Sequence, residues 1–107
     1  MSPMEEKRGA TRVPYRCETE CEDVESGARP PNPMISDISI TGVFVDTTVV
    51  FPQGSIVNLC FTLPSLVLRV QADVVHPMPT MGMGMRFRDL TPAQKAALEE
   101  IVEAGGS

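Results

Sequence analysis

Apolar and polar residues alternate along most of the chain with a period of two, which places successive side chains on opposite faces of a strand. Six segments show this alternation or a short apolar run consistent with it: residues 13–22, 34–37, 43–46, 56–63, 66–76 and 83–88. In the first segment Cys17 and Cys21 fall on the apolar face, whereas Glu18 and Glu20 fall on the charged face. We therefore predict six strands, each with one face towards a core.

Clusters of Gly, Pro and Ser separate these segments, and such residues favour turns. They predict four connections: residues 25–33, 51–54, 64–65 and 77–82. After the last strand the pattern changes to the spacing of a helix, with an apolar stripe formed by Ala97, Leu98, Ile101 and Val102. Thr91 and Gln94 fit a capping box before this stripe, and Gly105 fits its end.

The length of 107 residues suits a single domain. Closing a sheet of short strands removes its exposed edges, and a helix can cover one open end. The pattern alone therefore predicts an all-β fold with one helix, built as either a small antiparallel barrel or a sandwich.

The formal net charge of −5 disfavours a DNA-binding surface or a basic membrane patch. An anionic ligand would therefore need a local cluster of cations. No apolar run reaches the length that spans a membrane, and the charged N-terminus does not resemble a signal peptide. The three cysteines are an odd number, so structural disulfides are not expected. We expect a cytoplasmic protein.

Two polar clusters interrupt the strand pattern. Arg8 and Arg12 are spaced as Arg-x-x-x-Arg, and Asp37, Ser39 and Gly42 are spaced as Asp-x-Ser-x-x-Gly. Each cluster has an ordinary explanation on its own, because exposed arginines are common and Asp, Ser and Gly all favour turns. Both clusters in this order, inside an all-β pattern, resemble the signature of PilZ domains.

The resemblance implies a six-stranded antiparallel PilZ-type β-barrel with a C-terminal α-helix, and it implies binding of the second messenger cyclic di-GMP. Carried over, Arg8 and Arg12 would hold guanine and phosphate. Asp37 and Ser39 would hydrogen-bond the ligand, and Gly42 would keep the floor of the site flat. The residue types suit these roles, since arginine forks to phosphate and to guanine O6 and N7, and a carboxylate accepts from the guanine N1 and N2 hydrogens.

The resemblance extends over residues 7–102. The run 82–87 is similar to the late glycine-rich strand of the family, and the Asp-Leu-Thr-Pro before the helix is similar to its ending. Lys7, Gly84 and Arg86 are additional candidate contacts. The implied organisation has three parts: a flexible arm at residues 1–12 with the Arg-x-x-x-Arg motif, the PilZ barrel with its helix at residues 13–104, and a tail at residues 105–107.

The second motif also carries a geometric expectation. If it is extended, Asp37, Ser39 and Thr41 point to one face, while Ile38 and Ile40 point into the core. The three polar side chains would then line a site on the outside of the barrel, beneath an arm that becomes ordered around the ligand.

A second interpretation of the arginine motif stays open, because Arg12 and Arg16 have the same spacing as Arg8 and Arg12. We favour the first pair, since Arg16 falls on the outward face of the first strand. Met78 and Met81 could belong to a partner surface, because methionine suits adaptable contacts.

Catalysis is not expected, because the single histidine, His76, has no recognisable nucleophile or metal-ligand set beside it. We therefore expect a stand-alone cyclic di-GMP receptor that signals to a partner protein, without a metal or cofactor, without DNA or RNA, and without membrane insertion. The resemblance leaves motility, biofilm and exopolysaccharide control open as outputs. The alternative is a PilZ-like adaptor that binds a protein partner and no nucleotide.

Overall fold

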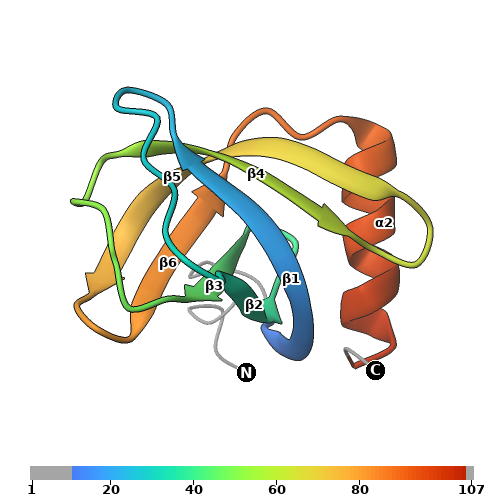
Figure 1. Cartoon of the computed structure of the whole chain (residues 1–107). Helices are drawn as coiled ribbons and strands as arrows, with labels where there is room; N and C mark the ends of the chain where they lie inside the picture. The colour runs from blue at the N-terminus through green and yellow to red at the C-terminus, as the bar shows by residue number, and fades with distance from the viewer. Residues whose placement is uncertain (1–10, 106–107) are drawn as a thin grey trace, which may run out of the picture.

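The computed structural model describes residues 11–105. The chain forms six strands and one helix: β1 (Val13–Asp23), β2 (Met34–Ile38), β3 (Gly42–Asp46), β4 (Ile56–Thr62), β5 (Val67–Met78), β6 (Gly82–Phe87) and α2 (Pro92–Glu103). The strands close into a barrel in the order β1-β2-β3-β6-β5-β4, and all neighbours are antiparallel (Figure 1). The predicted six-stranded antiparallel barrel with a C-terminal helix is confirmed.

The inward side chains of the strands form one core, as the period of two predicts. Its largest fully buried members include Ile35, Ile38, Leu59, Leu63, Leu68, Met83, Met85 and Leu98. On β1, Cys21 is buried and Cys17 is half-buried, whereas Glu18 and Glu20 are exposed. The predicted inward and outward faces of β1 are therefore confirmed.

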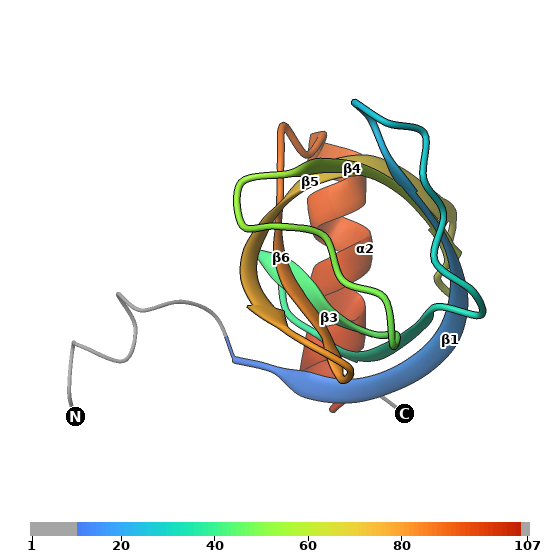
Figure 2. The same ribbon diagram turned by 60° about the vertical axis from the view of Figure 1, so that its left-hand side comes forward.

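Helix α2 crosses one end of the barrel, where Figure 2 shows it behind the ring of strands. It buries Ala97, Leu98 and Ile101 in the common core. The Thr91 side chain accepts from the backbone of Gln94, and the Gln94 side chain accepts from the Thr91 nitrogen, so the predicted capping box is confirmed. No helix within residues 11–105 has both the length and the apolar character needed to cross a bilayer.

Half of the predicted loop at residues 77–82 belongs to strands. Pro77 and Met78 belong to β5 and face Met83 and Gly82 of β6. The prediction of a loop was wrong because the fixed φ of proline, about −65°, is also compatible with extended backbone. The reversal is confined to the residues between the two strands, where Thr80 adopts a φ of 68°.

Candidate functional site

The second motif forms a tight reversal between β2 and β3. The Ser39 nitrogen donates to the Gly42 carbonyl at 2.8 Å. The Ser39 hydroxyl accepts from the nitrogens of Thr41 and Gly42, each at 3.1 Å. Such bonds from a short polar side chain to nearby backbone favour turns over a continued strand.

This turn corrects the geometric expectation for the motif. Ser39 is only 3% exposed and Ile40 is 37% exposed, so their predicted positions are reversed. Ile38, the last residue of β2, is fully buried, as expected. The Ser39 hydroxyl is therefore bonded to the backbone of the turn instead of standing exposed beside Asp37.

The packing of the sheet explains why position 42 is a glycine. A Cβ atom at this position would meet the carbonyl oxygen of Met85 on β6, and its φ lies outside the positive range. In the register of the sheet Gly42 lies opposite Arg86. The missing side chain thus lets β3 and β6 approach each other, which is a different reason from a flat floor for a ligand.

The structure brings together one residue from each motif. The Arg12 Nη1 donates to the Asp37 Oδ1 at 2.7 Å. The contact follows from the antiparallel pairing of β1 with β2, which places Pro14 opposite Asp37. Both side chains remain accessible, with 53% of Arg12 and 34% of Asp37 exposed. Arg8 and Lys7 lie outside the described residues.

A second arginine–carboxylate pair lies on the same outer surface. The Arg16 Nη1 lies 3.5 Å from the Asp46 Oδ2, joining β1 to β3. The sequence interpretation placed Arg16 outward but did not pair it with Asp46. The alternation of both strands indicated outward side chains, but the pairing depends on a register that β1 shifts between Pro14 and Cys17.

The remaining candidates lie on β6, next to β3. Arg86 is exposed, whereas Gly84 is covered and lies opposite Phe44 of β3. Asp73, which faces Arg86 from β5, is paired with Arg88 at 3.3 Å. We use the name arginine face for the outer surface of β2, β3 and β6 with the adjoining start of β1, defined by Arg12, Arg16, Asp37, Phe44, Asp46, Gly84 and Arg86.

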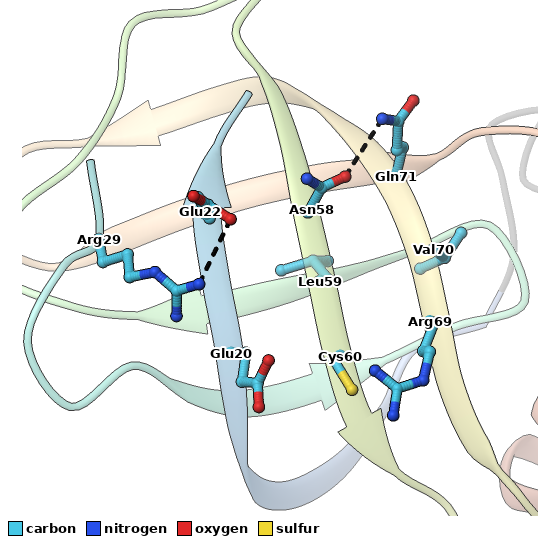
Figure 3. A pocket seen from close by; sticks show the side chains of 9 residues that line it. All are labelled: Glu20, Glu22, Arg29, Asn58, Leu59, Cys60, Arg69, Val70 and Gln71. Carbon is cyan, nitrogen blue, oxygen red and sulfur yellow. Dashed lines mark hydrogen bonds and ion pairs between the residues drawn. The ribbon is translucent and has the colours of Figure 1, made fainter. Parts of the chain in front are cut away.

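A hollow of about 350 Å³ lies elsewhere, on the outer surface of β1, β4 and β5. Figure 3 shows its lining residues, which are Glu20, Glu22, Arg29, Asn58, Leu59, Cys60, Arg69, Val70 and Gln71. Two internal contacts cross it: Gln71 donates to Asn58 at 3.1 Å, and Arg29 pairs with Glu22 at 3.4 Å. Of the sequence-predicted site residues that fall within the described part of the chain, none lines this hollow.

The thiols of Cys17 and Cys21 do not resemble nucleophiles. Burial, and secondarily the charge of Glu18, raises the pKa of Cys17 to about 11. Burial, with Asp23 second, raises the pKa of Cys21 to about 12. Both thiols are therefore protonated at neutral pH, and the reactive form is the thiolate. Within residues 11–105 no group of three or more His, Cys, Asp or Glu side chains is arranged to hold a metal ion.

The family model of the PilZ domain matches residues 4–104, so the chain belongs to the PilZ domain family. The resemblance seen in the two motifs is thereby confirmed. No curated protein matches the chain significantly.

Solved PilZ domains share the fold. The PilZ domain of CeSA from a cellulose-synthesizing bacterium has a TM-score of 0.68 at 14% identity, covering 89% of this chain and 97% of its own. The PilZ domain of YcgR from Escherichia coli with c-di-GMP has a TM-score of 0.67 at 12% identity, covering 92% and 91%. A further structure of Escherichia coli YcgR in complex with c-di-GMP has a TM-score of 0.67 at 14% identity; the match covers 92% of this chain but 45% of that one.

Proposed function

We propose that this chain is a receptor for cyclic di-GMP that binds the nucleotide on the arginine face and performs no catalysis. The observation that carries the proposal is the contact between Arg12 and Asp37, at 2.7 Å. It joins the two motifs at one exposed position, although the residues lie 25 positions apart. Family membership supports the ligand class, because YcgR, a PilZ protein, is described with c-di-GMP bound.

The two side chains of this pair match a guanine base. The Arg12 guanidinium can donate in parallel to guanine O6 and N7 or to a phosphate oxygen. The Asp37 carboxylate can accept from the N1 and N2 hydrogens of the base. On binding, contacts to the ligand would replace the contact between Arg12 and Asp37. This replacement costs little free energy, because an exposed ion pair contributes only about 0–1 kcal/mol.

The turn between β2 and β3 acts as the support of the site in this proposal. Ser39 fixes the backbone after Asp37 through its hydroxyl, and Gly42 lets β3 pack tightly on β6. Their roles are thus to hold Asp37 in place, while Arg8, with Lys7 beside it, would complete the cation cluster around the phosphates. Arg86 and Gly84 would border the ligand on the β6 side.

Local charge favours an anionic ligand at this place although the chain has a formal net charge of −5. The arginine face carries three arginines against two carboxylates, which are the partners in its two ion pairs. A doubly charged dinucleotide gains from a site with excess positive charge, because charge-assisted contacts to phosphate are among the stronger hydrogen bonds.

Signalling would follow from a change of surface. In the proposal, the N-terminal residues 1–12 become ordered around the nucleotide, and a partner protein reads the new surface. The binding free energy of the ligand would supply the cost of this ordering. The output, including motility or biofilm control, depends on that partner.

The proposal is tested by calorimetric titration of the protein with cyclic di-GMP, with cyclic di-AMP and GTP as controls. We expect saturable binding of cyclic di-GMP and no binding of cyclic di-AMP, since adenine lacks the O6 acceptor and the N1 and N2 donors. GTP has one guanine instead of two and should bind more weakly than cyclic di-GMP. Chromatography of the ligand after incubation should return it unchanged. A folded protein that shows no heat of binding would reject the receptor function and favour the adaptor; turnover of the ligand would reject the absence of catalysis.

A further inference from the structure

Phe44 occupies an unusual place for an aromatic residue. It lies on the outward side of β3 and is partly exposed. The register places it between Asp37 of β2 and Gly84 of β6. Its strand neighbours Val43 and Val45 are fully buried in the core, so the ring faces away from the core.

The ring lies along the glycines of β6. A Cβ atom built at Gly82 would come within 2.6 Å of the Phe44 Cε2 and 2.9 Å of its Cζ. A Cβ atom at Gly84 would lie 3.8 Å from the Phe44 Cδ1. The two glycines alternate with the buried Met83, so both positions face outward. The ring therefore fills the space that outward side chains of β6 would otherwise occupy.

Arginine–carboxylate pairs flank this ring on two sides. Asp37, across the sheet from Phe44, contacts Arg12 at 2.7 Å. Asp46, two residues along β3 and on the same outward side, lies 3.5 Å from Arg16. A partly exposed aromatic ring thus lies near two arginine–carboxylate pairs and opposite the carboxylate that the proposed function assigns to a guanine edge.

We propose that Phe44 is the stacking platform for one guanine base of the bound dinucleotide, with Arg16 as an additional cation for its phosphates. The inference rests on the proposed function. Every base has a π-face that can stack on an aromatic ring, and Asp37 is the nearest cross-strand neighbour that could accept from the base edge. Packing on Gly82 and Gly84 holds one side of the Phe44 ring against the backbone of β6. This packing limits the conformational entropy that the ring would lose on binding.

The first test replaces Phe44 by Leu and by Tyr and measures cyclic di-GMP binding by calorimetry. We expect Phe44→Leu to lower affinity by roughly 5- to 100-fold, the range for loss of one aromatic–base stack. Phe44→Tyr keeps the ring and should bind within about threefold of the parent, by the same argument. Thermal unfolding of each variant verifies that the leucine still covers the glycines.

A second test reads the stack directly. The chain has no tryptophan, so Phe44→Trp introduces a single indole at the platform, which can be excited at wavelengths where Tyr15 does not absorb. Guanine stacked on the indole should quench its fluorescence with the same midpoint as calorimetry. Val67→Trp, at a position on β5 that is 50% exposed, is the control and should not respond.

The outcomes separate this inference from the proposed function. If the parent binds cyclic di-GMP but Phe44→Leu binds equally well, or the indole fluorescence of Phe44→Trp stays constant during binding, the platform is wrong and the receptor function stands. If the parent does not bind, both fall. A loss of binding in Phe44→Leu with unchanged thermal stability, together with quenching in Phe44→Trp, supports the platform.

Discussion

The arginine face and the hollow are both outer surfaces of one barrel, yet they differ in how their side chains are arranged. The hollow is a concave surface with a volume of about 350 Å³ (Figure 3). Its charged residues, two arginines and two glutamates, are balanced in sign. The arginine face has three arginines against two carboxylates, and it adds the partly exposed ring of Phe44, which packs over Gly82 and Gly84.

Concavity and local charge thus indicate different surfaces of this barrel. In the hollow Glu22 faces Asn58 and Asn58 faces Gln71 across the strands. Four of its polar side chains pair with one another, Gln71 with Asn58 and Arg29 with Glu22. The arginine face takes two of its cations from the beginning of β1 and the residue before it, where Arg12 pairs with Asp37 of β2 and Arg16 pairs with Asp46 of β3. An excess of cations beside an aromatic surface suits a phosphate ligand with bases.

The largest expected effect separates the two faces directly. Arg12→Ala should weaken cyclic di-GMP binding about 100-fold or more, because a charge-assisted fork is lost. Arg69→Ala, in the hollow, should leave affinity unchanged. Calorimetry on both variants makes the comparison, and equal affinity of Arg12→Ala and the parent would remove the assigned site.

Gly42→Ala tests whether this glycine serves the fold or the ligand. The added methyl would meet the Met85 carbonyl, so we expect the free energy of unfolding to fall by about 3 kcal/mol, at the upper end for overpacking. Gly84→Ala, whose Cβ would lie 3.3 Å from that of His76, should lose less. Urea unfolding measures both. A Gly42→Ala protein of parental stability that no longer binds would instead support close approach of the ligand.

Asp37→Asn tests whether the Asp37 carboxylate accepts hydrogen bonds from guanine or only competes with the ligand for Arg12. If the carboxylate accepts from the base, affinity should fall about tenfold, since the charged acceptor is lost. Glu22→Gln is a matched control, because Glu22 is 36% exposed and also paired with an arginine. Tighter binding of cyclic di-GMP by Asp37→Asn would mean that Asp37 pairs with Arg12 without contacting the ligand.

Arg16→Ala should have a smaller effect, because the side chain is 64% exposed and its contact at 3.5 Å is long. We expect about a threefold loss of affinity and a shallower dependence on salt, as for one lost phosphate contact. Arg29→Ala is matched to it, with 61% exposure and a 3.4 Å contact to Glu22. Binding measured at two salt concentrations decides, and identical behaviour of the two variants would exclude Arg16 from the site.

The smallest effect concerns the interior beneath both faces. Burial raises the pKa of Cys21 from 9.0 to about 12, so between these pH values the folded protein keeps a proton that the unfolded chain releases. Stability should therefore decline as pH rises above about 9. This is tested by the melting temperatures of Cys21→Ala and Cys60→Ala from about pH 8 to about pH 10.5, a range that spans the pKa of the thiol in the unfolded chain. The fall of the melting temperature with pH should be less steep than in the parent only in Cys21→Ala. Parallel slopes would argue against the buried thiol as the cause.

Local patterns in the sequence predicted most of the fold. The period of two located the strands and the inward positions of Met83 and Met85, and the Thr91 capping box located the helix. Each of these signals acts within a few residues. The prediction was wrong at Ser39, where bonds from the hydroxyl to the backbone produced a turn instead of a strand.

The candidate site was predicted in part. The motifs named Arg12 and Asp37, which the structure brings together. The pairing of Arg16 with Asp46 spans 30 residues and depends on strand register after a bulge, which no local pattern encodes. The position of Phe44 over β6 likewise requires the neighbouring strand to present glycine, a property of the folded sheet.

An amide chemical-shift map of the isotopically labelled protein, titrated with cyclic di-GMP, would decide between the two faces in one experiment. We predict that the largest shifts occur at Asp37 and Phe44 on the arginine face and at Gly42 in the adjoining turn, while Asn58 and Cys60 in the hollow stay unchanged. Shifts concentrated at Asn58 and Cys60, with Asp37 and Phe44 unaffected, would place the ligand in the hollow and refute a nucleotide site on the arginine face.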